Sequence, residues 1–566
     1  MTLVFTNINN RLRSTQVLNV LMVLLLAGIC WVAHFWQINT FGLYEDDYSF
    51  IGTPISTDIN GVISLVINKW LTFSQGRSLG FSLAYILSFI SFNIGGINGV
   101  YCCGYLIILS NTLLFYWLMW RLTRSMRAAG IGGLAFCLFP ADTTATFLTH
   151  SLGLYACVTF FLLATHAYLS DRRWLAYLAI TASLISYETC FPLFLVAPLL
   201  KNKWERRIAN QLIKHAAILG IILSISIITR KLVSESRMVE LNPLTAIGTA
   251  IWHTLAGPFI SLGMYFYRPF YTLTNWRSEL FVFVPICMIL IWAILAKLAS
   301  SNVNSSILTA RDKIIPRSQL WVIGIIMLFL AYPLTIILKV TDIDGRASRV
   351  HLAAIIGGSI LCALGGDRLL ANARTNIQKR LVTIWLATIF ALLVGFGSIV
   401  QNDYRIAWTK QQNFLTNIIK ICPDLEEGTS IFVEQKDLHN PLQIAAYSWS
   451  MPTLLEYIYE FPNQWQVVPR IYPLYGNWQD RIENANLLPL SKITEWLAWL
   501  PKQHAGVVKT QNVIMLKMID ERLIRLDRLS LKNGGILKFK HRDSLAKLNF
   551  PTRPLYPLLI RSNSKK

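Results

Sequence analysis

Charged residues are scarce in this 566-residue chain: Asp, Glu, Lys and Arg make up 14% of it, whereas apolar side chains make up 54%. A soluble protein of this length carries more polar surface, so the composition excludes a soluble globular protein and indicates a polytopic membrane protein. Cysteines are also few. Eight of the nine lie in or beside apolar segments, and their spacing predicts neither a disulfide framework nor a metal site.

Internal repeats, low-complexity linkers and an excess of acid are missing as well. The chain has 30 acidic residues against 52 Lys and Arg, which gives a net charge of +22. Such a charge can indicate nucleic-acid binding. Here the cations lie mostly in short loops between apolar runs, where membrane topology explains them, so we expect no nucleic-acid partner.

Apolar runs long enough to span a bilayer dominate residues 1–400. One stretch, 174–200, is interrupted at Glu188 and flanked by cations at both ends, so we expect it to enter the membrane and return, with Glu188 at the bend. Together with that pair, the sequence predicts about eleven spans. The uninterrupted runs are 17–37, 99–120, 129–147, 151–169, 214–229, 280–296, 320–339 and 381–400.

The distribution of cations predicts the orientation in a plasma (inner) membrane. About 20 Lys and Arg fall in one set of loops and about 10 in the other, which favours a cytoplasmic N-terminus. Residues 45–47, Glu188 and the 342–349 loop then face outward. Two stretches, 78–96 and 246–267, would reverse this polarity if they crossed, and we interpret both as helices at the outer interface because Gly or Pro breaks each.

After about residue 401 the apolar runs end. Residues 401–566 are therefore predicted to form a small extracytoplasmic α/β domain, and residues 1–400 a membrane domain whose first outer loop covers about 38–98. Within the tail, short strands are predicted at 428–433, 465–472 and 512–517, and helical pieces at 454–459 and 493–500.

Three consecutive carboxylates, Glu45, Asp46 and Asp47, follow the first apolar run within a few residues. Adjacent acids beside a bilayer raise the free-energy cost of ionising one another. Catalysis at the membrane surface, with one carboxylate taking a proton from a sugar or lipid hydroxyl, is one explanation for the cluster. A solvated turn that begins a helix is the other.

Other charged side chains are predicted to share the outer side with these acids. A hydroxyl acceptor needs a base and a departing phosphate needs positive charge, so the mixture suits transfer of a group from a phosphate. A divalent cation, Mg²⁺ or Mn²⁺, is an alternative or an addition to guanidinium groups. Each residue also has a structural reading, as a headgroup anchor, a buried hydrogen bond or a helix cap. The candidates are Arg77, Asp142, His150, Glu188, Arg346 and Arg349.

Six features together resemble the GT-C superfamily of polytopic glycosyltransferases, most closely its protein-mannosyltransferase-like and bacterial lipopolysaccharide-sugar-transferase-like branches. The resemblance covers about residues 1–400, and the sequence of the tail matches no family. The features are the cytoplasmic N-terminal helix, the Glu45-Asp46-Asp47 acids, the Gly76-Arg77 segment, the short helix ending in Phe139-Pro140-Ala-Asp142, the Ser186-Tyr-Glu188 bend and the presence of a soluble outer tail.

This resemblance implies a polyprenyl-phosphate sugar donor and an inverting displacement on the outer face. It implies Asp46 as the base, with Asp47 as its partner in orientation or metal binding. The protein-mannosyltransferase branch has Asp-Glu where this chain has Asp-Asp, so a lipid, a glycan or a protein all remain open as the acceptor. A polysaccharide polymerase or ligase, and a transporter or flippase for lipid-linked saccharides, are the alternatives, although the absence of paired halves argues against the transporter.

Overall fold

The computed structural model is mainly helical and divides into two compact units, which are described separately: residues 1–39 with 62–402, and residues 40–61 with 403–566. The acidic segment 45–47 thus belongs to the second unit, whereas the sequence-based prediction placed it in the membrane domain, residues 1–400. The structure describes residues 2–201, 204, 207–235, 242–300, 315–434, 443–447, 450–474, 487–489, 507–509, 512–519, 522–531, 534–539 and 551–561.

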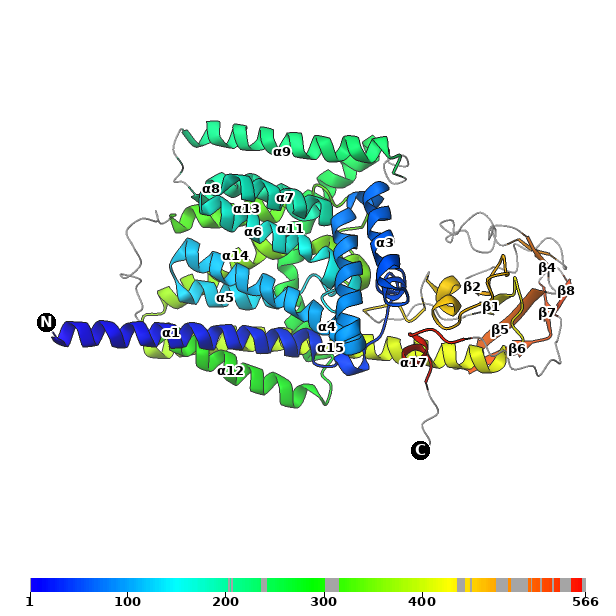
Figure 1. Ribbon diagram of the computed structural model, residues 1–566. Helices are drawn as coiled ribbons and strands as arrows, with labels where there is room; N and C mark the ends of the chain where they lie inside the picture. Colours follow the sequence, from blue (N-terminus) through cyan, green and yellow to red (C-terminus); the bar gives the residue numbers. More distant parts are fainter. Residues whose placement is uncertain are drawn as a thin grey trace. The chain divides into compact units, whose positions relative to one another are not determined.

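The α-helices of the first unit lie largely side by side (Figure 1). Short 3₁₀ or π segments interrupt them: η1 (Trp31–Phe35), η2 (Ile38–Thr40), η4 (Ser74–Gly76), η5 (His150–Leu154), η6 (Glu188–Val196) and η7 (Gly345–His351). The α-helices are α1 (Thr2–Cys30), α3 (Ile59–Leu71), α4 (Ser78–Thr123), α5 (Met126–Cys137), α6 (Ala156–Leu169), α7 (Arg173–Ser186), α8 (Ala197–Lys201), α9 (Arg207–Leu232), α11 (Pro243–Thr274), α12 (Leu280–Ser300), α13 (Arg317–Leu330), α14 (Ala354–Asn372) and α15 (Asn376–Ile421).

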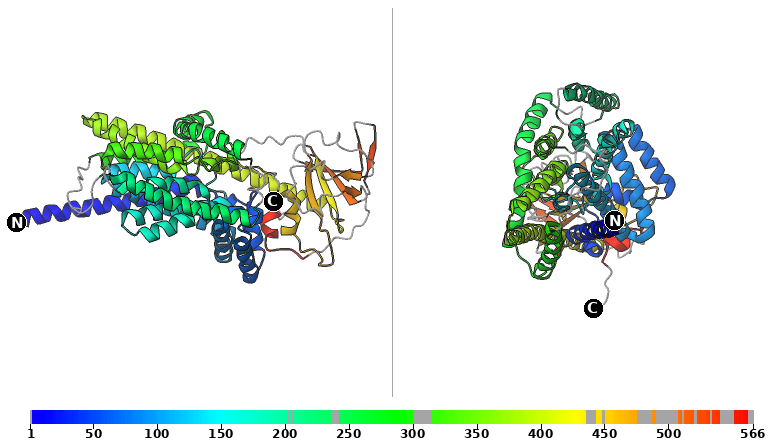
Figure 2. Two further views of the ribbon diagram at one scale, coloured as in Figure 1. Left: turned by 90° about the horizontal axis from the view of Figure 1, so that it is seen from above. Right: turned by 90° about the vertical axis from the view of Figure 1, so that its left-hand side faces the viewer.

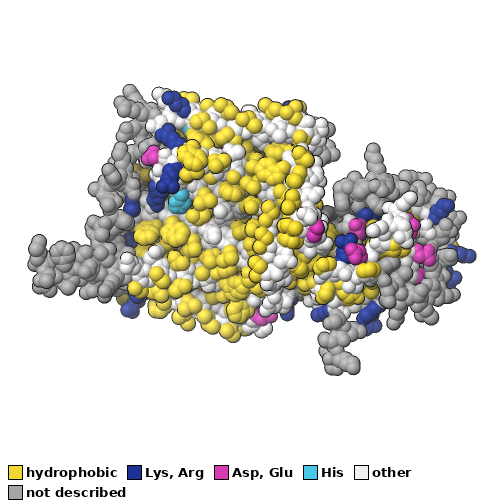
Figure 3. Space-filling view, in the orientation of Figure 1, with side chains coloured by type: hydrophobic (Ala, Val, Ile, Leu, Met, Phe, Trp, Pro, Cys, Tyr) yellow, Lys and Arg dark blue, Asp and Glu magenta, His cyan; other side chains and the backbone are white. Residues whose placement is uncertain are grey.

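Within the described residues, seven helical stretches are long and apolar enough to span a membrane, and four apolar helices of 10–17 residues are shorter, against the predicted total of about eleven. Large apolar side chains such as Leu244 and Phe266 are mostly exposed on this unit, as expected of a surface that faces lipid. Figure 3 shows apolar side chains covering the visible face and Lys and Arg gathered at one end of the helices. The chain is therefore a multi-pass membrane protein.

Two of the predicted spans are shorter helices than the sequence indicated. The run 129–147 forms a helix only to Cys137, since Pro140 lacks a backbone donor and disfavours helix in the residue before it. The run 320–339 likewise stops at Leu330, three residues before Pro333. The predicted topology also requires a crossing between the outward 342–349 loop and the cytoplasmic cations at 368–380, and α14 (Ala354–Asn372) is a long apolar helix at that place.

The segment 78–96 begins α4, which is broken where Gly95 and Gly96 leave helical geometry (φ/ψ −144°/22° and 58°/−152°). Figure 1 shows α3 and the first part of α4 running across the direction of α1, α5 and α14. That is the orientation expected of helices lying along a membrane surface. The other segment interpreted in this way, 246–267, lies within α11, which is not among the long apolar helices.

Three loops predicted on one side of the membrane meet in an ion cluster. Arg127 Nε lies 3.2 Å from Asp367 Oδ1, and Arg317 Nη2 lies 2.7 Å from Asp367 Oδ2. Asp367 is only 1% exposed, so the arginines compensate a buried charge. The contact brings together the start of α5, the start of α13 and the later part of α14. Figure 2 shows the helices from two further sides.

The second unit contains a four-stranded mixed sheet in the order β2-β1-β5-β6, in which β1 is parallel to β2 and β5, and β6 is antiparallel to β5. Ser430 pairs with both Arg470 and Val513, and Phe432, Tyr472 and Met515 lie in the core. The elements are η3 (Tyr48–Gly52), α2 (Thr53–Ile55), β1 (Ser430–Glu434), η8 (Met451–Tyr457), β2 (Arg470–Leu474), β3 (Leu487–Pro489), β4 (Val507–Lys509), β5 (Val513–Ile519), β6 (Arg522–Leu526), β7 (Arg528–Ser530), β8 (Ile536–Lys538) and α17 (Tyr556–Leu559).

The small α/β domain predicted for the tail is confirmed. The strands predicted at 428–433 and 512–517 match β1 and β5, while the one predicted at 465–472 begins only at Arg470. The helical piece predicted at 454–459 overlaps the 3₁₀ helix η8, and that at 493–500 lies outside the described residues.

Candidate functional site

Arg77 is presented by a short loop with an unusual backbone. Phe73, Gln75 and Gly76 have φ values of +42°, +56° and +70°, in the left-handed region that L side chains rarely adopt. The loop ends at Arg77, which immediately precedes α4. Such strain persists only where surrounding contacts hold it, and here they include the hydrogen bond from Ser78 Oγ to Lys69 O and the contacts of the Arg77 side chain.

The Arg77 guanidinium forms a two-pronged ion pair with Glu188. Nη2 donates to Oε1 at 2.6 Å and Nε donates to Oε2 at 3.0 Å, while the guanidinium lies 4.3 Å from the ring centre of Tyr187. Burial on its own would raise the pKa of the Glu188 carboxyl, but the facing Arg77 charge holds that pKa below its usual value. Both groups are therefore charged, in the bidentate geometry that suits arginine.

Close backbone packing brings these two residues together. A Cβ on Gly80 would lie 2.6 Å from the carbonyl oxygen of Ser186, and one on Gly153 would lie 2.9 Å from the carbonyl oxygen of Gly80. Only glycine permits both approaches, which bring the start of α4 against the end of α7 and the end of η5 against the start of α4. Tyr187 then leaves the helix in an extended conformation and Glu188 follows it.

A second basic group lies beside the first. Arg349 Nη1 is 3.0 Å from Nε2 of His150, which is 1% exposed and packs edge-on against Phe147. Because a guanidinium only donates, His150 Nε2 accepts and its proton lies on Nδ1. Among the described residues, Nδ1 has no hydrogen-bond partner.

Arg77, Glu188 and Arg349 line one hollow that is open to the surface. Its remaining wall is aliphatic and comes from the segment that follows α13. The further lining residues are Tyr187, Leu334, Thr335, Ile336, Ile337, Leu338 and Val350. The hollow thus combines two guanidinium groups and one carboxylate with an apolar side.

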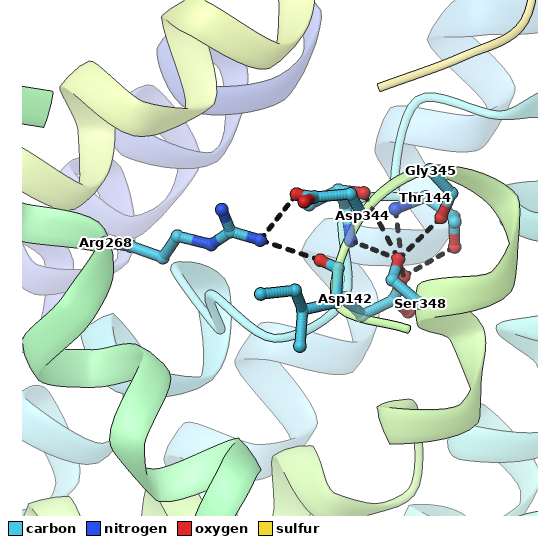
Figure 4. Close-up of polar contacts among 8 residues, drawn as sticks. Asp142, Thr144, Arg268, Asp344, Gly345 and Ser348 are labelled. Carbon is cyan, nitrogen blue, oxygen red and sulfur yellow. Dashed lines mark hydrogen bonds and ion pairs between the residues drawn. The ribbon is translucent and has the colours of Figure 1, made fainter. Parts of the chain in front are cut away.

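Asp142 lies next to this group in a dense hydrogen-bond network (Figure 4). Its Oδ1 accepts from the backbone N–H and hydroxyl of Thr144 at 2.9 and 2.6 Å and from Ser348 Oγ at 3.5 Å, and its Oδ2 accepts from Tyr155 at 3.0 Å. Burial raises the pKa of Asp142, and these donors offset part of that rise. With its oxygens so occupied, Asp142 organises the loop before His150.

The sequence analysis missed Arg268, on α11. This side chain is 1% exposed and donates from Nη2 to Ile343 O and to Asp344 Oδ1, both at 2.7 Å. Its guanidinium also lies 4.5 Å from the ring centre of Phe396. The sequence feature that could have indicated Arg268 is a cation within the aromatic run Tyr265-Phe-Tyr-Arg268-Pro-Phe-Tyr271, because a buried charge in such a run needs a partner.

The three acids after α1 belong to the second unit. Asp47 is fully buried and its Oδ2 accepts from the backbone N–H of Tyr44 at 3.3 Å, whereas Asp46 is half-buried. Glu45 is buried with φ +40°. Asp47 thus holds the turn, and Asp46 is the carboxylate of the pair with more contact to solvent.

The structure brings Arg77, Glu188, His150 and Arg349 into one neighbourhood and links Asp142 to it through Ser348. Arg346 lies on the same 3₁₀ helix as Arg349, three residues earlier, and residues so spaced align in that helix. In the part of the chain that the structure describes, no three His, Cys, Asp or Glu side chains gather as a metal site.

No protein-family model matches the chain, and no curated protein matches it either. Among solved structures, the chain is similar to the crystal structure of ArnT from Cupriavidus metallidurans bound to undecaprenyl phosphate. The identity is 13% and the TM-score 0.37, over 88% of this chain and 93% of that chain. A likeness of this degree leaves the family and the activity of this chain to its own residues.

Proposed function

We propose that the protein is a membrane glycosyltransferase that moves a sugar from a polyprenyl-phosphate donor to a lipid, glycan or protein on the outer face. The observation that carries the proposal is the composition of one hollow, where Arg77 and Arg349 lie beside an aliphatic wall. The phosphodiester of such a donor carries one negative charge, which becomes two when the sugar leaves, and the prenyl chain attached to it is wholly apolar. Guanidinium groups beside aliphatic side chains suit both parts of such a donor.

In this proposal the arginines act on the leaving group. As the bond between the anomeric carbon and the phosphate oxygen breaks, negative charge grows on the phosphate, and Arg77 and Arg349 stabilise it. Glu188 prevents the guanidinium of Arg77 from turning away and keeps it oriented. His150, whose Nε2 accepts from Arg349, orients the second guanidinium in the same way.

Asp46 is proposed as the base. The acceptor hydroxyl forms a bond to the anomeric carbon from the face opposite the phosphate, and its proton passes to the Asp46 carboxylate, so the configuration inverts. Asp47 is proposed to hold the turn that carries Asp46, as its buried contact with the Tyr44 N–H suggests. Glu45 is proposed to contribute to acceptor binding.

Charge compensation by Mg²⁺ or Mn²⁺ is the alternative to the two arginines. The described residues offer no cluster of three acidic, His or Cys ligands, so no step of the proposal runs through a metal. Transfer that continues in excess chelator supports the arginine-based proposal, whereas transfer that stops and is restored by added Mg²⁺ or Mn²⁺ supports a metal.

The proposed orientation has the N-terminus in the cytoplasm and residues 403–566 outside the plasma membrane, as the bias of Lys and Arg predicts. Reaction of cysteines introduced at exposed positions of the tail with a membrane-impermeant reagent in intact cells would test it.

The experiment uses purified protein in vesicles with a radiolabelled polyprenyl-phosphate sugar and a set of candidate acceptors. We expect the Asp46→Asn variant to lose about two to four decades of transfer rate, because the hydroxyl loses its base. Asp58→Asn is the matched control: Asp58 accepts from the N–H of Gly61, and asparagine serves that capping position equally well.

Full activity in Asp46→Asn would exclude its assignment as base. Wild-type protein that moves the intact lipid-linked sugar across the bilayer, without releasing prenyl phosphate or glycosylated product, would show a transporter instead of a transferase.

A further inference from the structure

Arg346 and Arg349 lie in a loop that is tied down at two points (Figure 4). At its beginning, Arg268 Nη2 contacts both Ile343 O and Asp344 Oδ1. At its end, Ser348 Oγ lies 3.0 Å from the backbone nitrogen of Thr143, which donates to it, and 3.1 Å from the Thr143 hydroxyl. The three residues between Asp344 and Ser348 include Arg346 and Gly345, whose φ is +65°, and Arg349 directly follows Ser348.

The first of these ties is costly to maintain. Arg268 is 1% exposed, whereas the side chain of Asp344 is 53% exposed, so the arginine bears most of the loss of hydration. Ring faces of Tyr267, Tyr271 and Phe396, with centres 4.5–5.8 Å from the guanidinium carbon, supply part of the compensation. Within the described residues, Arg268 Nε has no hydrogen-bond partner.

An aliphatic side chain of similar volume would pack α11 at lower cost, so stability by itself is a weak explanation for this arginine. The guanidinium adds directional hydrogen bonds. Because it bonds to the backbone carbonyl of Ile343 and to the side chain of Asp344, it fixes both the position and the orientation of the loop. Arg346 and Arg349 follow Asp344 by two and five residues, so their Cα positions depend on it.

We propose that Arg268 is a positioning residue: through Ile343 and Asp344 it fixes the loop that presents Arg346 and Arg349 to the anionic group of the lipid donor. This inference rests on the proposed function for its ligand, although the tie itself does not. Its consequence is that the donor meets preorganised cations and loses less free energy in ordering them.

The test compares Asp344→Asn with Asp342→Asn. Both remove one negative charge from the same loop, but only Asp344 contacts Arg268. The first measurement is hydrogen exchange of the backbone amides at 345–349, in wild type and both variants without any ligand. We expect faster exchange in Asp344→Asn alone, with an unchanged thermal midpoint. Unchanged exchange in Asp344→Asn, or an equal increase in Asp342→Asn, would overturn the inference.

The second measurement is sugar transfer at varied concentrations of a polyprenyl-phosphate sugar. We expect Asp344→Asn to raise KM about threefold to fivefold with kcat within twofold, as for an ion pair with one exposed partner. We expect the KM of Arg268→Lys to lie between those of the wild type and Arg268→Gln, because lysine keeps the positive charge. A purely structural arginine would lower the amount of folded enzyme and leave KM unchanged, which would overturn the positioning role.

The two measurements separate the inference from the proposed function. If the wild type neither binds nor consumes a prenyl-phosphate sugar, the proposed function fails, and the exchange data still decide whether Arg268 positions the loop. If the wild type is active and exchange is faster in Asp344→Asn while KM is unchanged, Arg268 holds the loop but the loop does not present Arg346 and Arg349 to the donor. The inference then fails.

Discussion

The Arg77–Glu188 pair offers the sharpest test of the site, through a double-mutant cycle of Arg77→Gln and Glu188→Gln. The side chains are 8% and 19% exposed, so removal of either partner leaves the other charge buried. Such a loss costs about 3–5 kcal/mol. The ring of Tyr187 still faces the guanidinium and glutamine retains one hydrogen bond, so we expect about 3 kcal/mol for each single variant, or about 150-fold in the folded-to-unfolded ratio.

The double variant distinguishes a buried pair from two independent residues. Replacing both charges leaves neither unpartnered, so we expect a cost of about 3 kcal/mol or less instead of the additive value of about 6, a coupling of about 3 kcal/mol. The assay is unfolding by SDS in mixed micelles, followed by the fluorescence of the 18 tryptophans. Additive losses, or single variants that cost under about 1 kcal/mol as exposed pairs do, would refute the reasoning.

The same variants separate a structural pair from a phosphate site. Glu188→Gln keeps the guanidinium, and we expect it to retain binding of a polyprenyl phosphate in vesicles, whereas the double variant is expected to lose at least tenfold in affinity because a charge-assisted contact is gone. Equal binding by the folded double variant would show that Arg77 is not a ligand of the phosphate.

Two further predictions concern packing and reactivity. We expect Gly80→Ala to cost about 1–3 kcal/mol in the same unfolding assay, because the new Cβ would lie 2.6 Å from Ser186 O. Gly220→Ala is the control: its Cβ would meet nothing within 4 Å in a helix, so it should be neutral or stabilising. Equal effects of the two substitutions would contradict the close approach of Gly80 to Ser186. Burial raises the pKa of Cys422 to about 12, so at pH 8 only about one thiol in ten thousand is ionised, and we expect maleimide to label it in SDS but not in the native protein. Rapid native labelling of Cys422, read by mass spectrometry, would contradict its burial.

The membrane character, the tail domain and strands β1 and β5 were predictable because each depends on a strong local pattern. Apolar runs report burial in lipid whatever the tertiary packing, and a β-branched run between turn residues reports a strand. Helix lengths were less predictable. Pro140 and Pro333 shortened two runs that hydropathy alone extended.

The candidate residues were predictable as charges in a lipid environment, but their partners were not. That Arg77 pairs with Glu188 depends on an approach of Gly80 to Ser186 across more than 100 residues of sequence, and no local pattern encodes it. Arg268 was not predicted because it lies within a helix, whereas the predicted candidates are charges of the outer loops.

The side chains of the site share one local property that explains both results. Arg77 follows a left-handed turn, His150 begins a π-helix, Glu188 begins a 3₁₀ helix after an extended residue, and Arg349 lies in another 3₁₀ helix. A regular α-helix would satisfy its own backbone and turn successive residues by about 100° per position, whereas these breaks let Arg77, Glu188 and Arg349 line one hollow and let His150 contact Arg349. The breaks were visible in the sequence as Gly76, Pro192 and Gly345, whereas their directions depend on the packing around them. Irregular backbone persists where surrounding structure holds it, so the meeting of these breaks around Arg77, Glu188 and Arg349 is an argument for a binding site independent of any likeness to another protein.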